Sequence, residues 1–413
     1  MAILKNKRPR SVLLILMIGA LNTITPISID MYLPAFPKIA RDLNTTVNNI
    51  ALSVSTYFLG FALGQILYGP LLDRFGRKRP LYVGLLLYIM ATIACGMANS
   101  VQFLWLIRFV QALSGCVAAV AAMAMVLDFF PADKSAGIIS LLILILGISP
   151  LLAPSVGSLI VTIFNWRFVF FALAAIAFVV LLVIFFFLPE GHTADRSVSL
   201  MPKRILTTFR RILFTHQFFI YAMAGTFSFA GLFVYVAGSP AIFMGEFQTN
   251  PKRYGLIFAC LSIGFIGSSQ LNHLLTRKFR NQEILKMTLT IQLIATLFFV
   301  ADIITGWYSM ASTILFLFVI LSCTGLTYPN AASLAIAPFA KNAGSASALL
   351  GFIQIGVGGL ISAGVGAMPV RGTLSTSSIM AVSSLAAFLI LILGSKLRSR
   401  SNLPERNIDL PKT

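Results

Sequence analysis

Long apolar runs separated by short polar segments fill the chain from residue 12 to residue 395. Runs bounded by charged or turn-forming residues number twelve, at 12–36, 48–72, 80–99, 101–127, 137–162, 166–188, 216–243, 254–275, 284–304, 309–337, 345–367 and 376–395. An α-helix needs roughly 20 apolar residues to cross a bilayer. The pattern therefore predicts an all-α membrane protein with twelve transmembrane helices.

The composition agrees with this prediction and excludes several other classes of protein. Hydrophobic residues make up 58% of the 413 residues and charged residues only 10%, which is too little charge to cover a water-soluble domain. The cysteines lie inside apolar runs without paired spacing, and the histidines are too far apart for a zinc motif. No nucleophile–base pair lies in the spans. We therefore expect no metal, no cofactor and no enzyme activity.

The net charge of +19 does not indicate nucleic-acid binding, because the basic residues lie in short segments between apolar runs and not on one folded face. With the first residues placed in the cytoplasm, 24 of the 31 lysines and arginines fall on that side and six outside. The positive-inside rule then places both termini in the cytoplasm. The first run resembles a signal peptide but shows no small-residue cleavage site, so we interpret it as an uncleaved helix.

The longest polar stretch, residues 189–215, divides the spans six and six. It predicts an N-terminal six-helix bundle at 1–188, a cytoplasmic linker at 189–215, a C-terminal bundle at 216–395 and a cytoplasmic tail at 396–413. The halves also repeat short strings in the same order, which favours a duplicated six-helix unit. These strings are Pro34-Ala35 with Pro240-Ala241, Gly60-Phe61 with Gly264-Phe265, and Leu71-Leu72-x-Arg74 with Leu274-Leu275-x-Arg277.

The polar loop after the second span combines glycines, an acid and several bases. Asp73 and Arg77, four residues apart, can pair on one helical face, and the basic loop includes Arg74. Gly76 suits a tight turn and Gly69 a close helix approach. The N-terminal end of the span that starts near residue 345 would attract Asp73. Breaking that contact when the cytoplasmic side opens would make it a latch.

The string from Gly69 to Lys78 resembles the signature loop of the major facilitator superfamily, G-x-L-x-D-R-x-G-R-K. This resemblance implies two pseudo-symmetric six-helix bundles that rock against each other. In that superfamily an acidic residue at the inner end of the fourth span joins the latch, and Asp128 occupies the matching place.

Arg108 lies inside the fourth predicted span. A charged side chain at the centre of a bilayer costs at least ~2.5 kcal/mol, so it should face a cavity or a partner unless it reaches the interface. The segment around Arg108 and Gln111 resembles the superfamily's fourth-helix motif R-x-x-Q-G, with Ala112 in place of the glycine. The resemblance implies that Arg108 lines the cavity and tunes a nearby carboxylate.

Asp30 is the one acidic residue clearly inside a span. A desolvated carboxyl group can bind and release a proton near neutral pH, so Asp30 is the candidate proton carrier. The alternative is an aspartate at the outer surface, because Pro37 follows within a turn or two.

The strings around Asp30 and over Leu59–Pro70 resemble the Bcr/CflA subfamily of drug:proton antiporters, whose members confer resistance to bicyclomycin or chloramphenicol. Some related multidrug antiporters carry a further acidic residue where this chain has Asn22. That departure leaves one candidate proton carrier and argues against dicationic substrates.

The fifth span contains Pro150 and Pro154, which bend a helix, between Gly147 and Gly157, which allow close packing. Kinked membrane helices are common, so this pattern alone says little. It partly resembles the antiporter motif of exporters in the superfamily, G-x-x-x-G-P-x-x-G-G, although two of the glycines are replaced. The resemblance favours export.

Several polar side chains in the apolar runs are candidates for the cavity wall, although tyrosines are also common at membrane interfaces. They are Tyr32, Tyr57, Gln111, Tyr235, Tyr328, Asn330 and Gln354. The sequence thus predicts a monomeric exporter of amphipathic drugs or small metabolites, driven by proton antiport across the bacterial cytoplasmic membrane. The alternative is a proton-coupled symporter of the same fold that imports a small solute.

Overall fold

The computed structural model describes residues 11–130, 149–189, 202–368 and 372–400, and helices make up nearly all of these ranges. The helices are α1 (Ser11–Asp30), η1 (Leu33–Ala35), α2 (Phe36–Asp42), α3 (Val47–Phe75), α4 (Lys78–Gly96), α5 (Val101–Phe129), α7 (Arg167–Phe187), α8 (Pro202–Leu213), α9 (His216–Pro240), η2 (Ala241–Glu246), α10 (Pro251–Leu275), α11 (Asn281–Ile304), α12 (Met310–Ile336), η3 (Ala337–Asn342), α13 (Ala343–Ala367) and α14 (Gly372–Arg400).

Eleven helical segments in the described ranges are long and apolar enough to cross a membrane, and Ser149–Ile163 forms a shorter apolar helix. We refer to the latter as helix 149–163. The predicted fifth span, 137–162, begins outside the described residues, and Gly147 also lies outside them. The prediction of an all-helical protein with many membrane-spanning segments is therefore confirmed, whereas the number twelve stays a prediction.

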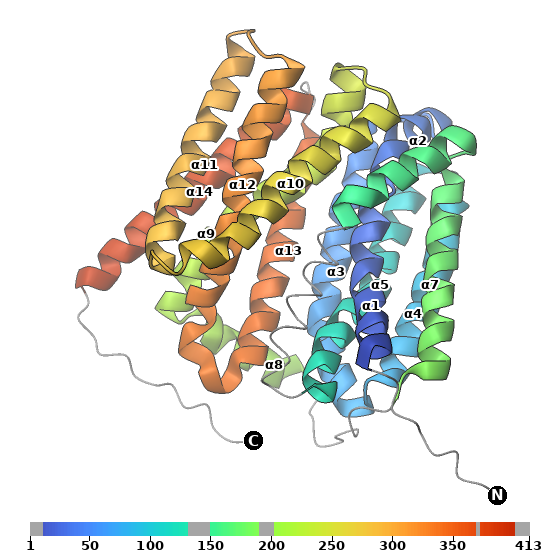
Figure 1. Cartoon of the computed structure of the whole chain (residues 1–413), viewed down its shortest axis with the longest axis horizontal. Coiled ribbons are helices and arrows are strands. Elements are labelled where there is room, and N and C mark those ends of the chain that lie inside the picture. The colour runs from blue at the N-terminus through green and yellow to red at the C-terminus, as the bar shows by residue number, and fades with distance from the viewer. Residues whose placement is uncertain (1–10, 131–148, 190–201, 369–371, 401–413) are drawn as a thin grey trace, which may run out of the picture.

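Figure 1 shows the helices up to α7 gathered on one side of the molecule and α9 to α14 on the other. Large apolar side chains point outward on both sides; Phe186, for example, is 70% exposed and Leu297 is 53% exposed. Such side chains suit a protein whose perimeter contacts lipid tails rather than water. Polar side chains such as Arg108 and Gln292 lie buried between the helices.

Helices α3 and α13 pack against each other and join the two sides. Glycine allows the close contact, because a Cβ added to Gly351 would lie 2.3 Å from Gln65 Oε1. Farther along the two helices, the hydroxyl groups of Ser55 and Ser362 form a hydrogen bond of 2.8 Å. Gln65 thus faces Gly351, whereas the earlier residue Ser55 faces the later residue Ser362. Helices α3 and α13 are therefore antiparallel.

The first predicted span, 12–36, is not one continuous helix. Helix α1 ends at Asp30, and the short helices η1 and α2 then continue the span to Asp42. Pro34 and Pro37 explain the break, because a proline lacks the N–H that a continuous helix needs for its i→i−4 hydrogen bond.

The predicted linker, 189–215, contains a helix that the sequence analysis did not predict. Helix α8 spans Pro202–Leu213 and contacts both α9 and α13. The segment is too polar on average to resemble the apolar spans, because four of its residues are basic.

Candidate functional site

The loop between α3 and α4 is organised around Arg77. Its Nη1 atom donates a hydrogen bond to Asp73 Oδ1 at 2.6 Å, and its Nε atom donates to Asp128 Oδ2 at 2.7 Å. The Asp73–Arg77 ion pair forms as the spacing predicts, and Asp128 of α5 joins it. The Arg77 side chain is 10% exposed and that of Asp73 is 50% exposed, so the cluster leaves Asp73 partly accessible.

Burial lowers the pKa of Arg77, but the hydrogen bonds and charges of Asp128 and Asp73 outweigh burial and raise this pKa above its ordinary value. Arg77 is therefore charged throughout the physiological pH range, and no pH dependence of transport arises from it.

The glycines and Arg74 of this loop differ in what they contact. Gly76 has a φ of 79°, which confirms the predicted tight turn. The predicted close helix approach at Gly69 is wrong, because a Cβ added there would meet no atom within 4 Å in the described part of the chain. The Arg74 guanidinium lies 5.9 Å from the ring centroid of Phe75.

Arg108 of α5 is fully buried, which excludes an arginine that reaches the membrane interface. Its Nη1 atom donates to Gln111 Oε1 at 2.7 Å and to the backbone oxygen of Ser28 at 3.2 Å. Its guanidinium lies 4.2 Å from the ring centroid of Tyr57 and 4.7 Å from that of Tyr32. Two aromatic faces thus stabilise the charge, and no described carboxylate forms an ion pair with it.

A buried hydrogen-bond network extends from Gln111 to α1 and α4. Gln111 Nε2 donates to Thr92 Oγ1 at 2.8 Å, Thr92 Oγ1 donates to the backbone oxygen of Tyr88 at 2.6 Å, and the Tyr88 and Ser28 hydroxyls lie 2.5 Å apart. Sequence reasoning missed Thr92 and Tyr88, because such residues are common in membrane helices and only their meeting in space distinguishes them. The network fixes α1 just before Asp30.

Asp30 is 5% exposed, so the alternative of an aspartate on the outer surface is wrong. The residues of η1, which follow it in the chain, are buried as well. Its Oδ2 atom has no hydrogen-bond partner in the described chain. Ser149 lies next to the carboxyl group, and Tyr235 and Tyr254 lie within electrostatic range of it.

Four segments meet around Asp30: the end of α1, helix 149–163, α9 and α10. Gly157 touches the backbone directly after α1, because a Cβ added to it would lie 2.1 Å from the backbone oxygen of Met31. In the same way, a Cβ on Gly255 of α10 would lie 3.3 Å from Ser155 Oγ. Pro150 and Pro154 lie in the same stretch of helix 149–163. We call this meeting point the Asp30 junction.

Helices α9 and α10 contribute aromatic and hydroxyl groups to the Asp30 junction. The ring of Tyr235 stacks on that of Phe258 with centroids 5.3 Å apart, and the Tyr254 and Ser239 hydroxyls form a hydrogen bond of 2.9 Å. The hydroxyl groups of Tyr235 and Ser149 are buried and have no hydrogen-bond partner in the described chain. Pairings between such distant segments leave no local pattern in the sequence.

Other predicted cavity residues lie elsewhere. The Tyr32 and Ser53 hydroxyls form a hydrogen bond of 2.9 Å, and Asn22 of α1 is half-buried. Asn330 of α12 donates to Asn272 Oδ1 at 2.7 Å. The Nε2 atom of Gln354 on α13 is buried and has no hydrogen-bond partner among the described residues.

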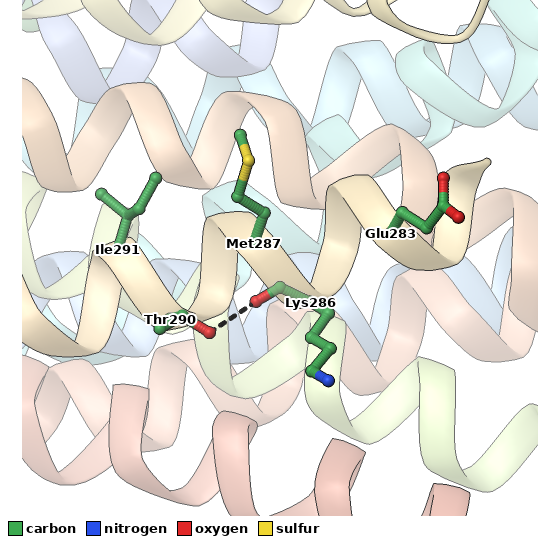
Figure 2. A pocket seen from close by; sticks show the side chains of 5 residues that line it. All are labelled: Glu283, Lys286, Met287, Thr290 and Ile291. Carbon is green, nitrogen blue, oxygen red and sulfur yellow. Dashed lines mark hydrogen bonds between the residues drawn. The ribbon is translucent and has the colours of Figure 1, made fainter. Parts of the chain in front are cut away.

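A shallow hollow on the surface of α11 is a different feature. Figure 2 shows its lining residues, which all come from that one helix: Glu283, Lys286, Met287, Thr290 and Ile291. A hollow formed by a single helix does not enclose a solute, and none of the predicted site residues lines it. We therefore do not assign the transport site to it.

Similarity to known proteins extends over most of the chain. Residues 18–363 match the Major Facilitator Superfamily. The chain is 26% identical over 403 residues to the bicyclomycin resistance protein homolog of Haemophilus influenzae, covering 97% of this chain and 100% of that protein. It is 29% identical over 343 residues to the multidrug resistance protein MdtL of Escherichia fergusonii, covering 81% of this chain and 84% of that protein.

Solved structures give the same fold. The crystal structure of a D-xylose-proton symporter matches with a TM-score of 0.71 at 14% identity, covering 97% of this chain and 99% of the symporter. The resemblance carried by the signature loop is thus confirmed, and the chain belongs to the Major Facilitator Superfamily of membrane transporters.

Proposed function

We propose that this protein exports small amphipathic drugs or metabolites across the bacterial cytoplasmic membrane in exchange for protons, with Asp30 as the proton carrier. The observation that carries this proposal is a buried carboxyl group with no cationic partner among the described residues, at the junction of four helices. The names of the relatives, a bicyclomycin resistance protein homolog and a multidrug resistance protein, favour efflux over uptake.

The architecture that we propose has twelve membrane spans in two pseudo-symmetric bundles, 1–188 and 216–395, with the linker 189–215, the tail 396–413 and both termini in the cytoplasm. Equivalent packing in the two halves supports it: α3 packs on α5 as α10 packs on α12, and α4 on α7 as α11 on α14. The repeated glycines agree, because Gly60 closely approaches Phe109 of α5 and Gly264 closely approaches Phe318 of α12.

Exchange follows from competition at Asp30. A buried carboxylate without a partner is costly, so the Asp30 junction is expected to hold either a proton on the carboxyl group or a substrate against it. When the two bundles rock, the occupied site faces one compartment and then the other. Arg108 supports this role by holding α1 through the Ser28 backbone oxygen. This role replaces the one that the family resemblance implies, in which the arginine acts directly on a nearby carboxylate.

Tyr235 is proposed to bind the substrate, because a buried hydroxyl group without a partner is available to a ligand. We expect Tyr235→Phe to raise the KM for bicyclomycin about fivefold to tenfold with kcat nearly unchanged, as for the loss of one hydrogen bond. Tyr254→Phe is the matched control, because that hydroxyl group already bonds to Ser239. An equal rise of KM in both variants would contradict the assignment.

Asp73 is proposed to act in the cytoplasmic latch. Continuing the antiparallel register of α3 and α13 places it opposite the first turn of α13, whose positive end favours an acidic side chain. We expect Asp73→Asn to lower kcat severalfold while substrate binding stays unchanged. Asp302→Asn, which changes an acid bonded to Ser312 near the end of α11, serves as control. Unchanged turnover of the Asp73→Asn protein would refute the latch.

Everted membrane vesicles separate export from the alternative of solute import. An antiporter lets bicyclomycin or chloramphenicol, added outside energised vesicles, exchange with luminal protons and collapse the pH gradient. A symporter that imports solutes gives no such collapse and instead drives uptake of labelled solute into energised intact cells. Collapse that requires this protein is the expected result, and uptake without collapse would favour the importer.

A further inference from the structure

Helix α8 is basic, amphipathic and attached to the start of a membrane span. Its sequence includes Lys203, Arg204, Arg210 and Arg211 and has no acidic residue. Helix α9, which is long and apolar enough to cross the membrane, begins almost directly after it at His216. Figure 1 shows α8 at the end of the molecule where α1 begins. The helix therefore lies where the chain enters the bilayer.

The two faces of α8 have different surroundings. Ile212 is fully buried, and Phe209 and Leu213 pack against a core cluster that includes Phe218. Away from this core, Leu206 is 68% exposed and the adjoining Phe214 is 74% exposed. The protein core thus covers only part of the apolar surface of this short segment.

Arginine side chains accompany the exposed apolar residues. The amide of Phe214 donates to the backbone oxygen of Arg210, so the helical turn continues and residues 206, 210 and 214 follow one another along one face. Arg210 and Arg211 are exposed and form no ion pair with any described residue. Exposed apolar groups beside free cations match the boundary between acyl chains and anionic headgroups.

We propose that α8 binds anionic phospholipids of the adjacent leaflet. Leu206 and Phe214 insert among the upper acyl chains, and Arg210 and Arg211 bind the phosphate groups. Helix α8 also contacts α13, which packs along α3. Lipids bound to α8 therefore act, through α13, on the pair α3 and α13 that joins the two sides of the molecule. The surface is independent of the Asp30 junction and of the identity of the solute.

The test uses the full-length protein carrying Phe214→Trp in proteoliposomes, with the protein that retains only its native tryptophans as the blank. Brominated phosphatidylglycerol is expected to quench the added tryptophan at a lower mole fraction than brominated phosphatidylcholine. Adding Arg210→Gln and Arg211→Gln should reduce this preference about fivefold per arginine. The control pair Arg277→Gln and Lys278→Gln, in the segment between α10 and α11, should keep it.

Three outcomes would overturn the proposal. Equal quenching by the two lipids with both arginines present would exclude a preference for anionic headgroups. Absence of quenching by either lipid would place residue 214 away from the bilayer. An equal loss of preference in the control pair would assign the effect to overall charge and not to α8.

Discussion

Asp30→Asn is expected to abolish drug export while the protein still reaches the membrane in normal amounts. Asparagine has nearly the same size and fits the buried position, but its amide does not bind and release a proton. Cells that depend on this transporter should therefore become as sensitive to bicyclomycin as cells without it. Growth at increasing drug concentration, with the amount of protein determined by immunoblot, measures the effect.

Two further variants make this prediction specific. Asp30→Glu retains a carboxyl group and should keep part of the activity, whereas Asp302→Asn removes an acid that bonds to Ser312 near the end of α11 and should keep nearly all of it. Full resistance in cells carrying Asp30→Asn would rule out proton carriage by this residue.

Gly157→Ala is expected to destabilise the protein by about 1–3 kcal/mol, the range found for overpacked sites, and to remove most of the transport activity. The added Cβ would lie 2.1 Å from the backbone oxygen of Met31. A backbone atom does not rotate away as a side chain does, so helix 149–163 must move away from the chain beside Asp30. Thermal unfolding in detergent and transport in vesicles measure the two effects.

Gly267→Ala is the matched control, because a Cβ added to Gly267 of α10 meets no atom of the described residues within 4 Å. Replacing glycine by alanine in a helix gains up to about 1 kcal/mol in helix propensity, and this gain applies to both variants. The difference between them therefore isolates the contact with Met31. Equal melting temperatures and equal transport rates would mean that helix 149–163 does not press on the backbone at Met31.

Local features of the fold were predictable from the sequence. The apolar runs located the described spans, and the spacing of Asp73 and Arg77 predicted their ion pair. Gly76 was predictable as a turn because few other residues adopt a positive φ. Each of these features depends on residues that are close in the sequence or on the length of one apolar segment.

Features that depend on distant segments were not predictable. Apart from Gln111 on the same helix, the partners of Arg108 are two aromatic rings and a backbone oxygen, and no spacing in the sequence indicates these. Ser149 and Tyr235 come near Asp30 only because segments distant in the sequence converge there. Helix α8 was missed for another reason, since its polar composition resembles that of a loop until its periodicity is considered.

The most direct test of proton carriage by Asp30 is the infrared difference spectrum of the purified protein between acidic and alkaline buffer, which needs no knowledge of the substrate. We predict a carbonyl band of a protonated carboxyl group that appears on acidification, persists in Asp302→Asn and is missing in Asp30→Asn. An Asp30→Asn protein with the same difference spectrum as the unaltered protein would contradict the account.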